Sequence, residues 1–298
     1  MTELFNKLKE ICGSRVLENE PMSEHTSFKV GGPASLYAAV ANADELAQVL
    51  RACNEAGTEY YIIGNGSNLL VRDEGYDGVI IELGRNFSEI SVDGNVVTAQ
   101  AGASMAAVAA AARDAGLTGF EFASGIPGTL GGGCVMNAGA YDGEIKNVLK
   151  SVKLMNKKGE IIEEEAEQLK LDYRYSNIPE RNLIVIEATL AFTPGDRNEI
   201  TAKMKELNAR RAAKQPLEYP SAGSTFKRPK GYFAGKLIQE AGMQGYTVGG
   251  AQVSEKHAGF VINKGGATAR DIWQLTCDVR EAVAMRAGVW LEREIKLL

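Results

Sequence analysis

The fold of this chain is decided by the stretch Ala123-Ser124-Gly125-Ile126-Pro127-Gly128-Thr129-Leu130-Gly131-Gly132-Gly133-Cys134-Val135-Met136-Asn137-Ala138-Gly139-Ala140-Tyr141. It holds six glycines among small and apolar residues and no charged residue. Backbone without side chains lets main-chain N–H groups approach a flat or anionic ligand closely. A surface loop would instead be rich in Ser, Asp, Asn and Lys. We therefore expect this stretch to be a loop that lines a cofactor.

A second glycine-rich segment, Gly64-Asn65-Gly66-Ser67-Asn68, follows the apolar run Tyr60–Ile63. It does not fit a dinucleotide-binding fingerprint, because it lacks the third glycine and the helix that must follow at once. Instead, Leu69-Leu70-Val71 continues as an apolar strand. Two interpretations stay open at this point: a tight turn between strands, or a nest of N–H groups that holds a phosphate.

Composition sets the broad class of the protein. With 298 residues, of which 45% are hydrophobic and 24% charged, the chain has an ordinary globular composition and room for two or three domains. The net charge of −5 and the lack of a basic block give non-specific nucleic-acid binding little support. We see no signal peptide and no membrane-length apolar run, so we expect a cytoplasmic protein. The four cysteines and two histidines lack ligand spacing, and no metal site is expected.

Hydrophobic periodicity predicts an α+β protein, with hairpins, rather than one doubly wound sheet. One amphipathic helix is expected over 44–56, with Asp44 as its N-cap and Gly57 as its stop. Further helices are expected over 103–115, 198–214 and 268–287. Strands are expected over 60–63, 79–83, 90–92, 96–100, 152–155, 160–163, 183–192 and 289–297, with turns at 93–94 and 156–159.

Three polar motifs in the second half of the chain each allow two interpretations. In Tyr173-Arg174-Tyr175-Ser176, the arginine either packs its stem on tyrosine faces or holds a guanidinium fork toward an oxyanion. In Ala222-Gly223-Ser224-Thr225-Phe226-Lys227, the serine either forms a turn or donates a proton. Glu292 and Glu294 share one face of the last predicted strand, where a carboxylate either protects an edge or serves a site.

Taken in this order, the segments resemble the UDP-N-acetylenolpyruvoylglucosamine reductases of bacterial peptidoglycan synthesis, in their shorter subtype. The resemblance runs from His25-Thr26-Ser27-Phe28-Lys29-Val30-Gly31-Gly32-Pro33-Ala34 to Leu291-Glu292-Arg293-Glu294. It implies an FAD-binding fold of the vanillyl-alcohol-oxidase (PCMH) type in two subdomains, over residues 1–75 and 76–196. It also implies a C-terminal α+β substrate domain over 197–298. The chain departs from one common variant at Arg228, where Asn can stand.

The resemblance also implies the chemistry: NADPH reduces FAD, and the reduced flavin passes hydride to the enolpyruvyl ether of a UDP-sugar, giving UDP-N-acetylmuramate. By analogy, Arg174 stabilises the negative charge, Ser224 donates the proton and Glu294 positions and polarises the group. Only the family motif, and no other feature of the sequence, favours Glu294 over Glu292 as the catalytic glutamate. The cofactor-binding residues implied are Gly64, Asn65, Gly66, Ser67, Asn68, Ser124, Gly125, Ile126, Pro127, Gly128, Thr129, Gly131, Gly132, Asn137, Ala138 and Gly139.

Two other functions stay open from the sequence. The first is another FAD-dependent oxidase of the same cofactor fold, in which Cys134 is the one residue of the central loops able to tether a flavin covalently. We expect Cys134 to be a small packing residue instead. The second is a nucleotide-binding protein without catalytic activity. Oligomeric state is not predicted.

Overall fold

The computed structural model describes residues 1–298 and contains seven α-helices and eighteen strands, so the predicted α+β class is confirmed. Its residues form two compact units that interleave along the chain. The first unit comprises Met1–Glu18, Ser35–Asn65 and Gly78–Arg210, and the second comprises Asn19–Ala34, Gly66–Asp77 and Arg211–Leu298. None of the seven α-helices combines the length and the hydrophobicity that a membrane span requires.

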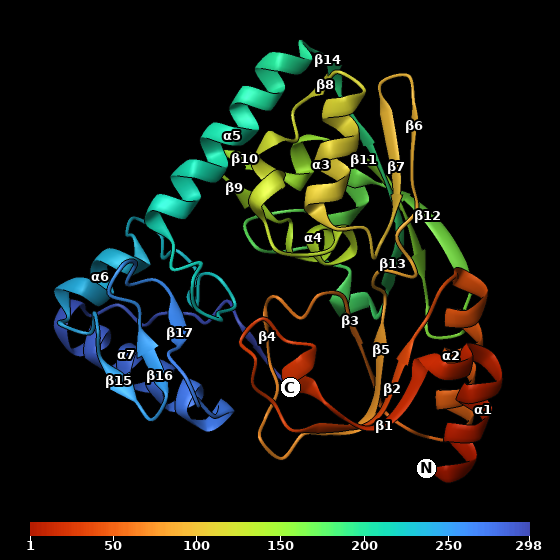
Figure 1. Cartoon of the computed structure of the whole chain (residues 1–298), viewed down its shortest axis with the longest axis horizontal. Helices are drawn as coiled ribbons and strands as arrows, with labels where there is room; N and C mark the ends of the chain where they lie inside the picture. Colours follow the sequence, from red (N-terminus) through yellow and green to blue (C-terminus); the bar gives the residue numbers. More distant parts are fainter. The chain divides into compact units, whose positions relative to one another are not determined.

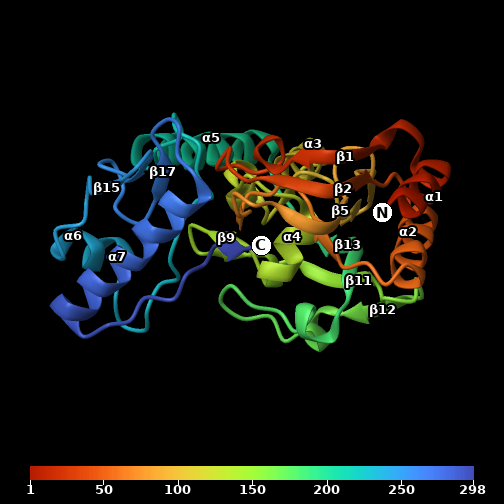
Figure 2. The ribbon, with the colours of Figure 1, turned by 90° about the horizontal axis from the view of Figure 1, so that it is seen from below.

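A four-stranded sheet lies near the N-terminus, in the order β1-β2-β5-β3, with β3 and β5 parallel. The two views place α1 and α2 side by side next to it (Figures 1 and 2). The bounds are α1 Thr2–Cys12, β1 Val16–Pro21, β2 Pro33–Ala39, α2 Ala43–Glu55, β3 Tyr60–Ile63 and β5 Tyr76–Glu82.

Helix α2 confirms the predicted helix but corrects its start. The side chain of Asn42 accepts a hydrogen bond from Glu45 N at 2.9 Å, so Asn42 is the N-cap. The predicted cap, Asp44, lies in the first turn, where its negative charge still favours the helix N-terminus. Gly57 has a φ of +60°, as expected for the glycine that ends a helix.

The second sheet has five antiparallel strands in the order β12-β11-β13-β7-β6. The predicted turns at 93–94 and 156–159 join β6 to β7 and β11 to β12, so both hairpins are confirmed. Helices α3 and α4 pack against the sheet, and their buried residues belong to the same hydrophobic core. The bounds are β6 Ile90–Asp93, β7 Val96–Gln100, α3 Met105–Asp114, α4 Leu130–Met136, β11 Leu149–Met155, β12 Ile161–Glu165 and β13 Ile184–Ala191.

Short elements complete the first unit. Strand β8 pairs with β14 and β9 with β10, both antiparallel. The polar helix α5 follows β14, as predicted. The bounds are β8 Leu117–Thr118, β9 Gly139–Ala140, β10 Gly143–Glu144, β14 Thr193–Pro194 and α5 Arg197–Lys214. Turns of 3₁₀ helix in this unit cover Gly13–Arg15, Glu121–Gly125, Ile145–Asn147, Ala166–Leu169 and Pro179–Arg181, and one in the second unit covers Met22–Glu24.

The second unit packs a long helix, α7, near a three-stranded antiparallel sheet, β15-β16-β17. Thr268 and Asp271 form a capping box at the start of α7, and Ile272, Leu275 and Val279 bury one face. Strand β4 pairs in parallel with β18. The bounds are β4 Leu69–Leu70, α6 Ala234–Glu240, β15 Thr247–Val248, β16 Ala251–Val253, β17 Val261–Asn263, α7 Ala269–Ala287 and β18 Lys296–Leu297.

The strand predicted over 289–297 is wrong for most of its length. Only β18 is a strand, and Arg293 forms a single bridge with Phe226. The carbonyl of Leu291 accepts the Arg280 side chain at 2.9 Å instead of a strand partner. The main-chain partner also changes along the segment: Glu294 N donates to Thr225 O, whereas Lys296 N donates to Asn68 O. No continuous ladder therefore forms.

Candidate active site

The glycine-rich stretch at 123–141 is not the open loop that the sequence predicted, because α4 occupies its centre. A Cβ on Gly131 would lie 2.8 Å from Ala101 Cβ, and one on Gly133 would lie 3.0 Å from Met105 Sδ. Both glycines therefore allow a close approach to neighbouring chain segments. Gly132, in contrast, is exposed, and a Cβ there would meet nothing closer than 3.7 Å.

Gly64 and Thr129, one from each glycine-rich stretch, lie against each other in the first unit. A Cβ on Gly64 would lie 2.2 Å from Thr129 Oγ1, so the end of β3 lies directly against the residue that precedes α4. Thr129 itself is buried. Two segments that are 65 residues apart in sequence thus place uncharged backbone in one region.

The Gly64–Asn68 segment forms a tight turn, in which Gly66 O accepts Leu69 N at 3.4 Å. Gly66 has a φ of +57°, and a Cβ there would lie 2.0 Å from the carbonyl oxygen of His25. The turn interpretation is therefore confirmed. It leaves the ligand interpretation open, because a turn with backbone on its surface is what a nest requires.

We expect Gly66→Ala to lower stability by about 2–5 kcal/mol, because the left-handed φ and the clash with His25 O add together. Gly94 supplies the matched control: its φ is +55°, but a Cβ there meets nothing within 4 Å. Gly94→Ala should cost only about 1–2 kcal/mol. Chemical denaturation of both variants checks this, and equal losses would contradict the steric argument.

Asn137 ends α4 in the left-handed conformation, with a φ of +42°, and is buried. Its Nδ2 donates to Glu144 Oε2 and to Asp172 O, each at 3.0 Å, and its Oδ1 accepts from Lys146 N at 2.9 Å. Protein partners thus use both donors of this side chain. Asn137 positions the chain around the glycines and the Asp172 turn.

Arg174 occupies a strained backbone position in the first unit. Asp172 and Tyr175 exchange two backbone hydrogen bonds of 3.1 Å, which closes a tight turn with Arg174 at φ +53°. Arg174 Nη2 donates to Gly139 O at 3.1 Å, and its guanidinium lies 5.1 Å from the Tyr173 ring centre. The structure thus places the guanidinium itself, rather than the stem, over one tyrosine ring, and it connects the guanidinium to the glycine-rich stretch. Strained backbone of this kind is concentrated at functional sites.

In the second unit, Thr225 brings Ser224 and Glu294 together. Thr225 N donates to Gly259 O at 2.9 Å, Thr225 O accepts Glu294 N at 2.8 Å, and Thr225 Oγ1 accepts Val261 N at 2.9 Å. Thr225 is fully buried, whereas the preceding Ser224 is exposed. Sequence reasoning gave Thr225 no role; its only signal is a hydroxyl residue within the Gly223–Phe226 motif.

The structure also distinguishes the two glutamates. Glu292 is exposed and pairs with Lys227 Nζ at 2.6 Å, which is an ordinary surface ion pair. Glu294 is half-buried, and its carbonyl accepts Asn68 Nδ2 at 3.0 Å. Asn68 belongs to the predicted cofactor segment, so the main chain of Glu294 is connected to that segment and to the residue after Ser224.

His257 and Arg228 both have local partners. His257 Nδ1 accepts Gly259 N at 3.1 Å, and the ring packs edge-on against Phe260. Burial lowers the pKa of His257, so the neutral ring is favoured. Arg228 lies 3.9 Å over the Phe233 ring on the surface. His257 therefore supports the turn around Thr225.

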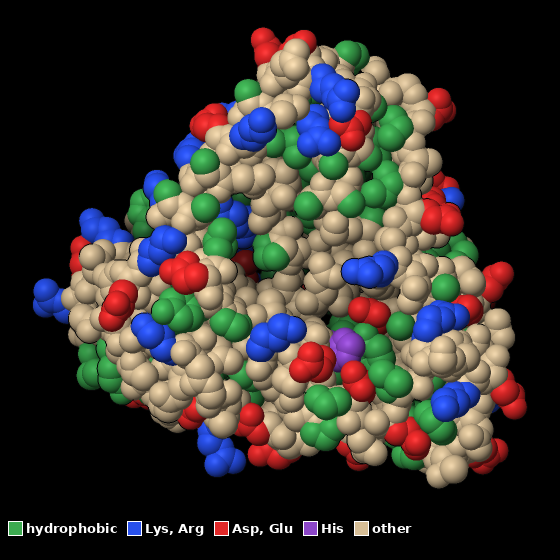
Figure 3. All heavy atoms as spheres, in the orientation of Figure 1, with side chains coloured by type: hydrophobic (Ala, Val, Ile, Leu, Met, Phe, Trp, Pro, Cys, Tyr) green, Lys and Arg blue, Asp and Glu red, His purple; other side chains and the backbone are tan.

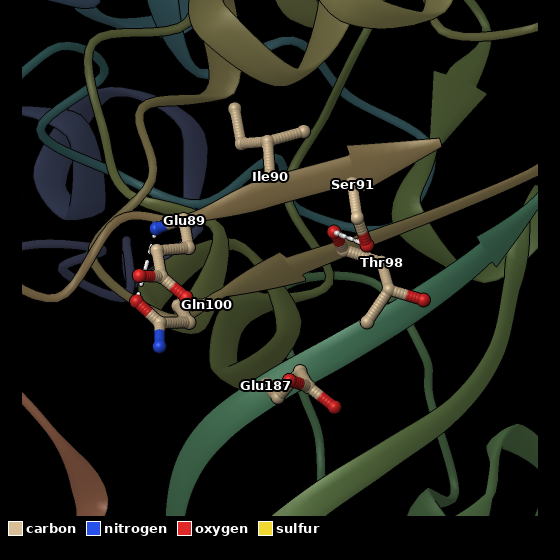
Figure 4. Close-up of a pocket in the computed structure, with 6 residues that line it drawn as sticks. All are labelled: Glu89, Ile90, Ser91, Thr98, Gln100 and Glu187. Atoms are coloured by element: carbon tan, nitrogen blue, oxygen red, sulfur yellow. Dashed lines mark hydrogen bonds between the residues drawn. The ribbon is translucent and has the colours of Figure 1, made fainter. Parts of the chain in front are cut away.

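A polar hollow of about 430 Å³ lies on the five-stranded sheet of the first unit (Figure 4). Glu89 N donates to Gln100 Oε1 at 2.9 Å, and Glu187 pairs with Lys153 at 2.8 Å. None of the predicted site residues lines it. On the molecular face in Figure 3, acidic and basic side chains are interspersed rather than gathered by sign.

The chain is similar to known proteins over nearly its whole length. A protein of Lachnoclostridium phytofermentans, named UDP-N-acetylenolpyruvoylglucosamine reductase, is 50% identical over 99% of this chain and 97% of its own length. The chain belongs to the UDP-N-acetylenolpyruvoylglucosamine reductase family. A reductase of the same name from Agathobacter rectalis is also 50% identical, over 95% of this chain and 94% of that protein.

Structure and domain families agree with membership of the reductase family. The crystal structure of UDP-N-acetylenolpyruvylglucosamine reductase (MurB) from Thermus caldophilus matches with a TM-score of 0.82 and 34% identity, over 95% of this chain and 98% of that one. Residues 34–164 match the FAD binding domain family, and residues 215–298 match the C-terminal domain of UDP-N-acetylenolpyruvoylglucosamine reductase. The chain is therefore an FAD-dependent oxidoreductase, as the resemblance implied.

The residues present in this reductase-family chain fit FAD. Gly64 and Thr129 bring two uncharged, glycine-rich backbone segments together within the first unit. Backbone of this kind suits both a flat ring system and a diphosphate. Cys134 does not suit a covalent tether: it is fully buried in the core, and burial raises the pKa of its thiol to about 12. It is the packing residue that the sequence predicted.

Proposed function

We propose that this chain reduces the enolpyruvyl ether of a UDP-N-acetylglucosamine derivative to UDP-N-acetylmuramate, with electrons from NADPH, in the synthesis of peptidoglycan precursors. The observation that carries the proposal is the Thr225 junction, where backbone hydrogen bonds hold exposed Ser224 beside half-buried Glu294. This junction lies inside the region that matches the C-terminal domain of the reductases.

The glycine-rich segments are the residues we propose to hold FAD. They comprise Gly64, Asn65, Gly66, Ser67 and Asn68, together with Ser124 to Thr129, Gly131, Gly132, Asn137, Ala138 and Gly139. When bound, FAD would accept hydride from NADPH and pass it to the enolpyruvyl double bond. The chain's own part is to hold the cofactor on backbone that carries no charge. The side-chain donors of Asn137 already have protein partners, so its proposed role is to position the glycine-rich backbone that holds FAD.

Arg174 is proposed to bind the carboxylate of the enolpyruvyl group. Hydride addition to the double bond moves negative charge toward that carboxylate, and a guanidinium stays cationic at any working pH. The contacts to Gly139 O and to the Tyr173 ring fix the fork in advance, so little reorganisation is needed when charge develops.

Ser224 is proposed to donate the proton that completes the reduction. A neutral hydroxyl is a weak acid, so it serves only where a strongly basic carbanion forms directly beside it. Gly223, at φ +72°, and buried Thr225 hold the serine backbone on both sides while its side chain stays accessible. Glu294 is joined by a main-chain hydrogen bond to Thr225, the residue after Ser224. Glu294 is proposed to position and polarise the reacting group.

An anaerobic titration tests the proposal. Purified protein should be yellow, NADPH should bleach the flavin absorbance, and the enolpyruvyl UDP-sugar should restore it. A colourless protein that takes up no FAD would rule out every flavoenzyme function. A flavin that NADPH bleaches, but that the substrate cannot reoxidise, would rule out the reductase and favour an oxidase of the same fold.

We propose three consecutive domains over residues 1–75, 76–196 and 197–298, the last of which binds the UDP-sugar. We also propose a cytoplasmic location, because NADPH and UDP-sugars are supplied there. Limited proteolysis between residues 196 and 197 would test the last boundary directly.

A further inference from the structure

An arginine occupies a core-facing position in the segment that carries Glu294. Leu291 and Ile295 are buried in the core of the second unit, and half-buried Arg293 lies midway between them. Neighbouring side chains of extended backbone point to opposite sides, so Arg293 shares its side with these two core residues. Because burial lowers the pKa of the Arg293 guanidinium, the cation there costs free energy that an aliphatic side chain would not. The reaction proposed above gives this arginine no role.

Three residues of helix α7 hold the Arg293 side chain. Its Nε donates to Thr276 Oγ1 at 2.7 Å, and its Nη2 donates to Cys277 Sγ at 2.9 Å. Its guanidinium carbon lies 3.8 Å from the centre of the Trp273 ring, which attracts a cation. Thr276 is fully buried, and its hydroxyl donates to Trp273 O at 2.7 Å, so this acceptor is itself fixed. Residues three and four apart share one face of a helix, and this face holds the planar guanidinium in one orientation.

The backbone of Arg293 forms the bridge that places Glu294. Arg293 pairs with Phe226 in an isolated antiparallel bridge. A main-chain hydrogen bond of 2.8 Å lies on each side of the pair, and one of them joins Glu294 N to Thr225 O, next to Ser224. A slip of one residue would turn every side chain of the segment to the other side. So short a bridge resists a slip weakly, whereas the directional contacts of the Arg293 side chain with α7 exclude it.

We propose that Arg293 is a positioning residue, whose contacts with α7 fix the register of the Phe226–Arg293 bridge and thereby the place of the Glu294 carboxylate relative to Ser224. All of these residues belong to the second unit. The inference rests on the proposed function, because Glu294 and Ser224 act there on the enolpyruvyl group. A purely structural role, in which Arg293 only stabilises the core of this unit, is the competing explanation.

The Arg293→Met holoenzyme separates the rate of the reaction from substrate binding. Methionine keeps an unbranched side chain but removes the charge and both donors. We expect the maximal rate of flavin reoxidation by the enolpyruvyl UDP-sugar to fall about 10- to 100-fold, because a misplaced carboxylate stabilises the transition state less well. The half-saturating substrate concentration should change less than about 3-fold. Flavin reduction by NADPH should keep the wild-type rate.

A double-mutant cycle with Glu294→Gln decides whether Arg293 acts through Glu294. Glutamine keeps the shape of the side chain and removes its charge, so Glu294→Gln alone should slow flavin reoxidation. Adding Arg293→Met to it should slow reoxidation by less than about 2-fold more, because the carboxylate to be positioned is already lost. Losses that multiply show that the two side chains act independently, and they overturn the proposal.

Two controls separate positioning from stability. Arg293→Lys keeps the charge and part of the donor capacity, so its reoxidation rate should lie between those of Arg293→Met and the wild type. It also carries the same comparison if Arg293→Met does not fold. Ile238→Val removes one methyl group from a fully buried residue of the same core, so it should lower the melting temperature and leave the reoxidation rate unchanged.

The outcomes that contradict the inference differ from those that contradict the proposed function. An Arg293→Met enzyme that loses stability but reoxidises its flavin at the wild-type rate supports the purely structural role and overturns the inference alone. A wild type whose flavin the substrate does not reoxidise refutes the proposed function. A Glu294→Gln enzyme with the wild-type rate refutes the proposed role of Glu294, and the inference with it.

Discussion

The Ser224→Ala variant is expected to keep flavin reduction by NADPH while its reduction of the enolpyruvyl substrate falls about 10²- to 10⁴-fold. The two half-reactions separate because the proton is needed only when the substrate accepts hydride. Ser224 is exposed, and the fold around it depends on the backbone and hydroxyl of Thr225. The substitution should therefore leave stability nearly unchanged. Stopped-flow absorbance of the flavin, recorded for each half-reaction, measures both rates.

Ser221 provides a matched control in the same segment of chain, because no role in the reaction falls to it. Ser221→Ala should keep both half-reactions at the wild-type rates. If Ser224→Ala slows both half-reactions equally, the serine contributes to cofactor or fold and the proton-donor role is wrong. A solvent isotope effect on the second half-reaction, lost in the variant, would support proton donation.

The Arg174→Lys variant is expected to reduce the enolpyruvyl substrate about 10²- to 10³-fold more slowly than wild type. Lysine keeps the positive charge but loses the planar fork that a carboxylate binds at two points. It also loses the donor to Gly139 O and the stacking on Tyr173 that hold the guanidinium. Arg197→Lys, on a surface arginine paired with Asp114, is the control and should change neither rate.

The backbone of Arg174 allows an independent check. Arg174→Gly and Arg174→Ala remove the same guanidinium, but only alanine must adopt the φ of +53° at a cost. The Arg174→Gly variant should therefore be more stable than the Arg174→Ala variant by about 0.5–1 kcal/mol. This difference includes the larger unfolded-state entropy that glycine brings. Denaturant titrations give the difference. Equal stabilities, or wild-type activity in either variant, would remove the argument that strain at this turn serves catalysis.

Local sequence signals predicted four of the seven α-helices and all five strands of the second sheet, but they missed α1, α4, α6 and most of the short strands. The hairpins at 93–94 and 156–159 and the helix begun by Thr268 were correct, because turn chemistry, capping and periodicity act over only a few residues. The N-cap at Asp44 was wrong by two positions, since Asn42 offers an equally good acceptor. The strand over 289–297 was wrong because alternation cannot show that its main-chain partners change along its length.

The sequence by itself determined the α+β class and the family of this protein, and it predicts which segments carry its chemistry, because glycine content, missing charge and motif order are properties of the chain alone. Only the tertiary structure separated Glu292 from Glu294, since one pairs with Lys227 at the surface and the other is joined to Asn68 and Thr225. It also showed that Gly131 and Gly133 are packing positions within α4 and that Ser27 lies beside Gly66. These facts depend on contacts between segments far apart in sequence, and no local pattern encodes them.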